Sequence, residues 1–92
     1  MTLEIVSPEA ILLQSEVTSV NVPGINGAFE MLTNHAPVVS LLKDGVIKIK
    51  GTLEIDEQFQ DKFSKGENGY TNLEITSGTI EMSENKIIIL VD

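Results

Sequence analysis

The sequence contains no cysteine, no arginine and no tryptophan. Without cysteine, neither a disulfide framework nor a thiolate metal site is possible. All six basic residues are lysines, and fourteen acidic residues outnumber them, so the formal net charge is −8. Nucleic acid and anionic lipid are bound by clusters of lysine and arginine, and an acidic surface repels both. The composition therefore argues against nucleic-acid binding and against direct binding to an anionic membrane.

Long hydrophobic runs are also missing. The longest run, Ile87 to Val91, has the length of a strand, whereas a helix that crosses a bilayer needs about 20 apolar residues. The N-terminus carries neither the basic segment nor the apolar stretch of a secretion signal. We therefore expect a cytosolic chain, or one attached peripherally to something larger.

The chain has 92 residues, of which 41% are hydrophobic. This length predicts one domain over residues 1–92, because it leaves no room for a second core. Folding at this size buries about 60–70% of the surface of the unfolded chain, so we expect a thin core.

Hydrophobic side chains recur with a period of two, which is typical of strands that are buried on one face. In the segment 46–56, Ile47, Ile49, Leu53 and Ile55 alternate with charged residues, and Gly51 keeps the phase. The pattern predicts one long strand from Val46 to Asp56, bent at the glycine.

Further short strands are expected along the whole chain. Near Ser77-Gly78 the alternation changes phase, which indicates a turn or bulge. The continuous apolar run of Ile87–Val91 after the Glu84-Asn85 turn predicts a central strand that is buried on both faces. Eight or nine strands with a turn about every ten residues favour an all-β sandwich or barrel. The other predicted strands lie at 3–6, 11–13, 18–22, 29–32, 38–42, 72–76 and around Ile80 and Met82.

The segment from Glu57 to Asn72 is harder to interpret. Phe59 and Phe63 fit the spacing of a helix and of a strand equally well. Asn68-Gly69 favours a type I′ hairpin turn, because both residues tolerate positive φ. We expect a protruding hairpin or ordered loop here, with a one-turn helix as the alternative.

The residues suited to catalysis are few. His35 is the only histidine, so a multi-histidine metal site and a Cys/His dyad are impossible, and no nucleophile-elbow pattern accompanies the serines. We interpret His35 as a turn residue bonded to the backbone.

Gly24–Gly27 lacks the lysine of a phosphate-binding loop and is expected to be a tight hairpin connection after Pro23. The acids at 54, 56, 57 and 61 lack the spacing of a calcium loop and indicate a solvated face. The chain is thus expected to be a binding or assembly module.

One segment has a distinctive sequence, VPGINGAFEMLTNHAPVV at Val22–Val39. It resembles the V-x-G-x-x-G…H-A-P-[LV] segment of the epsilon subunits of F-type ATP synthases, which are called delta in mitochondria. The resemblance extends to four other segments: LEIVSPE at 3–9, EVTSVNV at 16–22, GVIKI at 45–49, and SGTIEM at 77–82 followed by residues 86–92. These segments occur in the family's order over about four-fifths of the chain.

The resemblance implies a flattened β-sandwich of ten strands. It also implies a part of the rotor at the foot of the central stalk, which links the gamma subunit to the c-ring and supports the coupling of proton or sodium flow to ATP synthesis. Such a subunit has no catalytic residue, cofactor or metal of its own. By this resemblance we expect a monomer when isolated, held through the complex at the cytoplasmic face of the bacterial inner membrane.

The resemblance also suggests contact residues. The family's ring-facing loop corresponds to Gly27 through His35, with Gly27, Ala28, Phe29, Glu30 and His35 as candidates. Many members carry an acid where this chain has Ala28. Because alternation places residues 28 and 30 on one face, Glu30 is a candidate replacement, displaced by about 6–7 Å at ~3.3 Å per residue.

Contact with gamma is expected from Ser7 and His35, whose positions match family residues near that subunit. For each of them a role in turn geometry is the alternative.

Two departures from the family are visible. The segment 57–72 is longer than its usual counterpart, and the sequence ends without the C-terminal helical hairpin that regulates hydrolysis and binds nucleotide in some members. We therefore expect residues 1–92 to lack those two functions. The alternative to this assignment is an unrelated β-sandwich interaction module. A carbohydrate-binding face is disfavoured by the scarcity of aromatic residues, which are 4% of the chain.

Overall fold

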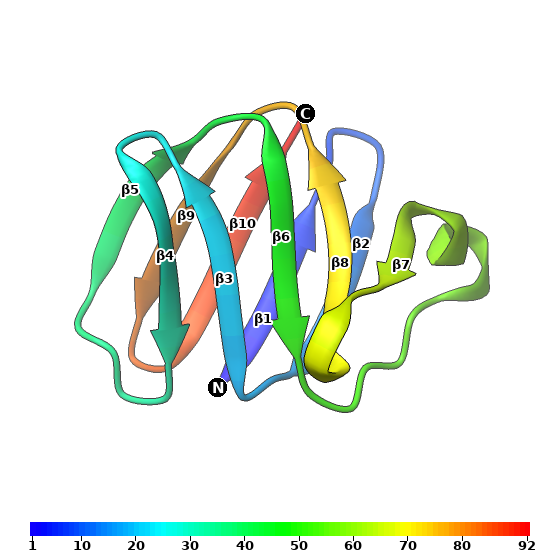
Figure 1. The fold of residues 1–92 in the computed structure, drawn as a ribbon, viewed down its shortest axis with the longest axis horizontal. Coiled ribbons are helices and arrows are strands. Elements are labelled where there is room, and N and C mark those ends of the chain that lie inside the picture. Colours follow the sequence, from blue (N-terminus) through cyan, green and yellow to red (C-terminus); the bar gives the residue numbers. More distant parts are fainter.

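A computed structural model describes all residues, 1–92, and contains ten β-strands and two short 3-10 helices (Figure 1). The prediction of an all-β fold is confirmed. No helical hairpin occurs within these residues, and neither helix is long or apolar enough to span a bilayer. The elements are β1 (Thr2–Val6), β2 (Ile11–Glu16), β3 (Ser19–Gly24), β4 (Gly27–Leu32), β5 (Val38–Leu42), β6 (Gly45–Lys50), η1 (Glu57–Lys62), β7 (Phe63–Lys65), η2 (Glu67–Gly69), β8 (Thr71–Ile75), β9 (Gly78–Ser83) and β10 (Lys86–Val91).

The strands form one hydrogen-bonded sheet that folds over into two layers. Its order is β2-β1-β10-β9-β5-β3-β6-β8-β7, and β4 pairs with β3. The fold-over occurs between β5 and β3, which share one register pair, Gly24 with Leu42. Figure 1 shows β4, β3, β6 and β8 in front of β5, β9, β10 and β1. We call these the front layer and the back layer.

The core fills the space between the two layers and consists of 18 buried hydrophobic residues. It is built from the alternating side chains of both layers, as period-two patterning requires. Phe29, Phe59 and Phe63 pack against it while remaining partly exposed. The buried residues are Leu3, Ile5, Leu12, Leu13, Val17, Val20, Val22, Met31, Leu42, Ile47, Ile49, Leu73, Ile75, Ile80, Met82, Ile87, Ile89 and Val91.

The long strand predicted from Val46 to Asp56 is wrong in its second half, because β6 ends at Lys50. There the Lys50 carbonyl accepts hydrogen bonds from the backbone amide and the hydroxyl of Thr18, at 2.8 and 3.0 Å. Gly51 follows with φ +155°, and a Cβ at this position would lie 3.0 Å from the Cα of Val17. Leu53 and Ile55 still pack against the core, although they belong to no strand. Their alternation reflects burial without strand pairing.

The prediction for the last strand is half correct. β10 is central, since it pairs in parallel with β1 and antiparallel with β9. It is not buried on both faces, because Leu90 is 51% exposed while Ile89 is fully buried. A two-layer sandwich gives each sheet one inner face, and no third layer covers the other face of β10.

The segment 57–72 combines the two predicted alternatives. η1 is the short helix, and its N-terminus is capped by the Asp56 carboxylate, which accepts from the amide of Gln58 at 3.0 Å. β7 then pairs with β8 as a hairpin. Asn68 and Gly69 both have positive φ, 56° and 81°, as predicted. They lie in η2 within a longer connection, however, and do not form the two-residue turn that was expected.

Candidate interaction surfaces

The β3–β4 hairpin carries the first group of predicted contact residues. Gly24 pairs with Gly27, so Ile25 and Asn26 form the tight two-residue turn that the sequence predicted. Gly27 has φ +125°, a conformation that favours glycine. A Cβ on Gly24 would lie 2.6 Å from the ring of Phe29, so the hairpin closes directly over that partly buried side chain.

The side chains of β4 alternate as expected. Met31 is buried in the core and Phe29 is partly buried against it, whereas Ala28 and Glu30 are exposed on the outer side. Ala28 and Glu30 therefore share the outer face of the front layer, which was the geometric condition for Glu30 to replace an acid at position 28.

Glu30 is already engaged within the molecule. Its Oε2 accepts a hydrogen bond from the Ser19 hydroxyl at 2.7 Å and another from the Tyr70 hydroxyl at 3.1 Å. The ring of Tyr70 in turn lies beneath the ammonium group of Lys50, 5.0 Å from the ring centroid. Ser19 and Tyr70 were not singled out from the sequence, because no local pattern connects them to Glu30. The carboxylate thus ties the 57–72 segment to the β3–β4 hairpin.

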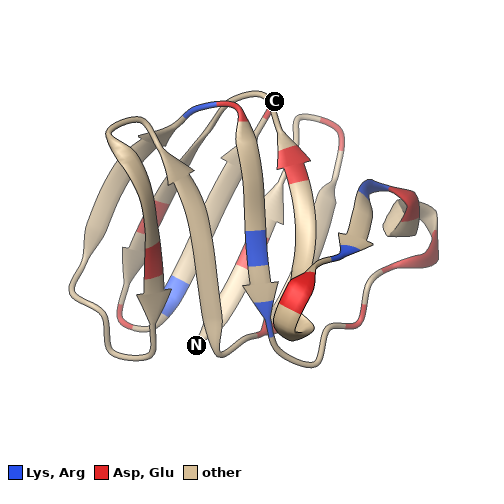
Figure 2. Ribbon diagram, viewed as in Figure 1, with Lys and Arg blue, Asp and Glu red and all other residues tan.

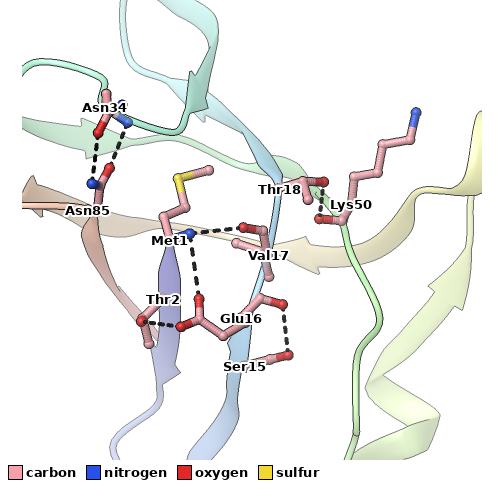
Figure 3. Close-up of polar contacts among 9 residues, drawn as sticks. All are labelled: Met1, Thr2, Ser15, Glu16, Val17, Thr18, Asn34, Lys50 and Asn85. Atoms are coloured by element: carbon pink, nitrogen blue, oxygen red, sulfur yellow. Dashed lines mark hydrogen bonds and ion pairs between the residues drawn. The ribbon is translucent and has the colours of Figure 1, made fainter.

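His35 is an exposed turn residue, as interpreted from the sequence. Its amide donates to the Leu32 carbonyl at 3.0 Å, and its Nδ1 lies 2.7 Å from the Ala36 carbonyl. The Thr33–Pro37 loop that contains it is also held by a side-chain contact with the β9–β10 turn. The backbone amide of Asn34 donates to Oδ1 of Asn85 at 2.6 Å, and Nδ2 of Asn85 donates to Oδ1 of Asn34 at 2.9 Å (Figure 3). We call this pair the asparagine clasp.

Further polar contacts fix the same end of the sandwich (Figure 3). The amine of Met1 donates to the Val17 carbonyl at 3.3 Å and lies 3.5 Å from the Glu16 carboxylate, which also accepts from the Thr2 hydroxyl at 3.2 Å. These contacts join the start of β1 to the end of β2. The start of β1 is also bonded to Asn85, whose carbonyl accepts from the Thr2 backbone amide at 2.9 Å. Asn85 in turn contacts the Thr33–Pro37 loop through Asn34.

Ser7 lies in the turn between β1 and β2, where its side chain has a clear geometric role. Its hydroxyl accepts from the Ala10 amide and lies 3.3 Å from the Ala10 carbonyl, and it is 3.4 Å from the Glu9 carboxylate. These bonds close the turn. They leave the predicted contact with gamma untested.

The structure does not gather the predicted contact residues into one patch. β4 runs the length of the sandwich between Gly27 and the loop that contains His35, so these two residues lie at opposite ends (Figure 1). Ser7, after β1, lies at the same end as the β3–β4 turn. The layers divide the residues differently, because Gly27–Glu30 belong to the front layer, whereas Ser7 and His35 adjoin β1 and β5 of the back layer.

The outer side of the back layer presents a row of mostly apolar residues that the sequence analysis missed. The registers align Leu41, Thr79, Leu90, Val6 and Ile11 across β5, β9, β10, β1 and β2. Leu41, Leu90 and Ile11 are each more than half exposed, at 57%, 51% and 53%.

Two more exposed apolar residues adjoin this row. Val39, two residues before Leu41 on β5, is 78% exposed, and Ile25 is bonded through its amide to the Leu41 carbonyl. We call the set Ile25, Val39, Leu41, Leu90 and Ile11 the apolar face. Exposed apolar side chains grouped on one side in this way are typical of a protein interaction site. Its signal in the sequence was the second hydrophobic set of β5 and β10, and of these only the β10 run, Ile87–Val91, was predicted to be buried on both faces.

The outer side of the front layer carries several charged residues. It carries Glu30, Lys48, Lys50 and Glu74, and Figure 2 shows these charged positions along β4, β6 and β8. The outer side of the back layer also carries charged residues, Glu4, Glu81 and Lys86, beside the apolar face.

Comparisons with known proteins agree with the resemblance seen in the sequence. The family model of the ATP synthase delta/epsilon chain β-sandwich domain matches residues 1–92. The ATP synthase epsilon chain of Chlorobaculum tepidum is 34% identical over 91 residues, which are 99% of this chain and 88% of that protein. The epsilon chain of Leptospira borgpetersenii is 37% identical over 92 residues, all of this chain and 61% of that protein.

Solved structures have the same fold. A chain from the central stalk and c-ring structure of the Tetrahymena thermophila mitochondrial ATP synthase aligns with a TM-score of 0.72 at 16% identity, covering 99% of this chain and 62% of its own length. A chain from the Euglena gracilis mitochondrial ATP synthase aligns equally well, over 97% of this chain and 48% of its own. On the evidence of the full-length family match and these relatives, the chain belongs to the delta/epsilon family of ATP synthase subunits, as its β-sandwich domain.

Proposed function

We propose that this chain is a non-catalytic rotor subunit of an F-type ATP synthase. It links the gamma subunit to the c-ring in the central stalk and thereby supports the coupling of proton or sodium flow to ATP synthesis. The match of the delta/epsilon family model to all 92 residues carries this proposal. The chain acts by offering complementary surfaces, and it contacts the membrane through the complex, at the cytoplasmic face.

The apolar face is the proposed contact with gamma. Its three half-exposed residues in one cross-strand row, Leu41, Leu90 and Ile11, would lose most of their contact with water on association. Burial of apolar surface contributes about 25 cal/mol per Å² before the costs of association. Ser7 adjoins this face directly after Val6. The loop of His35 leads into β5, so both predicted gamma-contact residues border the same layer.

The c-ring contact is proposed for the other predicted group, Gly27 to Glu30, on the β3–β4 hairpin. Because His35 lies at the opposite end of β4, a single flat contact with the ring does not include both His35 and Gly27. We therefore assign the ring contact to the hairpin and the contact of His35 to gamma.

The proposal is tested by mixing the chain with the gamma subunit of the same organism and measuring co-elution in size-exclusion chromatography, followed by an ATPase assay on the reconstituted catalytic head. We expect co-elution and no inhibition of hydrolysis. Failure to co-elute with a folded gamma subunit would contradict the rotor role. Strong inhibition would mean that the β-sandwich itself regulates the enzyme.

A further inference from the structure

The Thr33–Pro37 loop is an exposed connection at the edge of the sandwich, with few contacts of its own. All its residues are exposed, and its backbone makes one local hydrogen bond, from the His35 amide to Leu32. Exposed loops with few buried contacts open most easily, so a loop that must meet a partner in one conformation needs an anchor.

The asparagine clasp supplies that anchor from a distant part of the chain. Asn34 and Asn85 are 51 residues apart, and the Asn85 side chain accepts from the backbone amide of Asn34 and donates to the Asn34 side-chain oxygen. The clasp joins the loop to the two-residue turn between β9 and β10, which is itself fixed by the pairing of Ser83 with Lys86. The Asn85 carbonyl also bonds the amide of Thr2. Asn85 therefore connects the loop to two strands of the back layer.

The backbone geometry at both residues favours this arrangement. Asn34 has φ +69° and Asn85 has φ +60°, the left-handed region that asparagine tolerates better than most residues. Each side chain is thereby directed from a tight turn toward the other turn. The geometry is costly for most other side chains, so the two positions are suited to asparagine for the backbone and for the hydrogen bonds at once.

We infer that Asn85 is a positioning residue for partner binding, which holds the Thr33–Pro37 loop in the conformation that presents His35 to gamma. This inference rests on the proposed function. Asn85 acts through Asn34, and the contact with the partner is made by the loop. Loss of the clasp lowers the fraction of molecules in the binding-competent loop conformation, and the apparent affinity falls by the same fraction.

The test replaces Asn85 by glycine, because glycine keeps the positive φ and removes only the side chain. Binding of Asn85→Gly to gamma is measured by surface plasmon resonance or calorimetry, beside hydrogen exchange of the loop amides. We expect roughly three- to tenfold weaker binding, the effect of losing two neutral hydrogen bonds. We also expect faster exchange at the Asn34 amide, which loses its acceptor. Asn34→Gly removes only the bond from Asn85 Nδ2 and keeps the backbone donor to Asn85, so it should weaken binding less than Asn85→Gly, and the double variant should resemble Asn85→Gly.

The matched control is Glu84→Gly, a substitution in the same turn at a residue that also has positive φ, +51°, but takes no part in the clasp. It should leave binding and Asn34 exchange unchanged. Unchanged binding of Asn85→Gly, when the wild-type chain binds, would overturn the positioning role and leave the rotor proposal intact. Unchanged exchange at Asn34 would overturn the clasp itself. Equal losses in the Glu84→Gly control would overturn it too, because the effect would then belong to the turn.

Discussion

The hydroxyl of Tyr70 donates a hydrogen bond to the carboxylate of Glu30 across 3.1 Å, although 40 residues separate the two in the chain. This contact closes the long 57–72 segment onto the β3–β4 hairpin. The Glu30 carboxylate, which we propose contacts the c-ring, thus also accepts hydrogen bonds within the molecule. Experiments have to separate these two roles.

The contribution of this contact to stability is tested with Tyr70→Phe, which removes the hydroxyl and keeps the ring beneath Lys50. We expect the free energy of unfolding to fall by about 0.5–1.5 kcal/mol, the net value of one hydrogen bond, and nearer the lower figure because the pair is exposed. Thermal denaturation should show a decrease of a few degrees, at about 4–8 °C per kcal/mol. An unchanged Tm together with unchanged hydrogen exchange in residues 57–70 would contradict the closing role.

The proposed charge contact of Glu30 with the ring is tested by comparing Glu30→Gln with Glu30→Ala in ATP synthesis by the reconstituted enzyme. Glutamine keeps an oxygen that accepts from Ser19 and Tyr70 but removes the charge. If the charge matters, both variants should couple poorly; if only the internal bonds matter, glutamine should couple normally and alanine should not. Normal coupling by Glu30→Ala would eliminate both roles.

The apolar face is tested with Leu41→Asp. The side chain is 57% exposed, so the isolated variant should fold with nearly wild-type stability. A carboxylate buried in an apolar interface has no partner, and we expect binding to gamma to weaken at least tenfold, or about 1.4 kcal/mol. Ser64→Asp, which adds the same charge at an exposed position on β7, is the control and should bind normally. Equal binding by both variants would place the gamma contact elsewhere.

The one-sided burial of β10 is tested by two neighbouring substitutions. Ile89→Ala should cost about 2–5 kcal/mol, because Ile89 is fully buried and its truncation leaves a cavity. Leu90→Ala should cost less than about 1 kcal/mol in the isolated chain, since Leu90 is half exposed. Urea denaturation of both variants measures the difference. Similar losses at the two positions would mean that both faces of β10 are covered in solution.

Local chemistry predicted several elements well. The Pro23–Gly27 hairpin, the Glu84-Asn85 turn and the strand Val38–Leu42 occur where they were expected. In each case residues that favour a turn stand next to an alternating segment, so the conformation depends on neighbours in sequence. The backbone-bonded His35 was predictable for the same reason.

Errors arose where the outcome depended on distant chain segments. β6 ends at Lys50, where Thr18 bonds to the Lys50 carbonyl and the backbone of Gly51 passes close to Val17. The alternation that continues to Ile55 gives no sign of this. The exposed Leu90 was assigned to the core because a hydrophobic run does not reveal whether a third layer exists.

The sequence by itself determined the all-β class, most of the turns, the acidic charge and the membership in the delta/epsilon family. These properties follow from composition, from period-two patterning and from short motifs, which are all local. The tertiary structure alone decided that Gly27 and His35 lie at opposite ends, that Leu41, Leu90 and Ile11 are exposed on the back layer, and that Tyr70 meets Glu30 and Asn34 meets Asn85. The physical reason is that these two contacts join residues 40 and 51 positions apart. The pairing of β4, β3, β6 and β8 in one layer and of β5 with β9 in the other determines which of them meet.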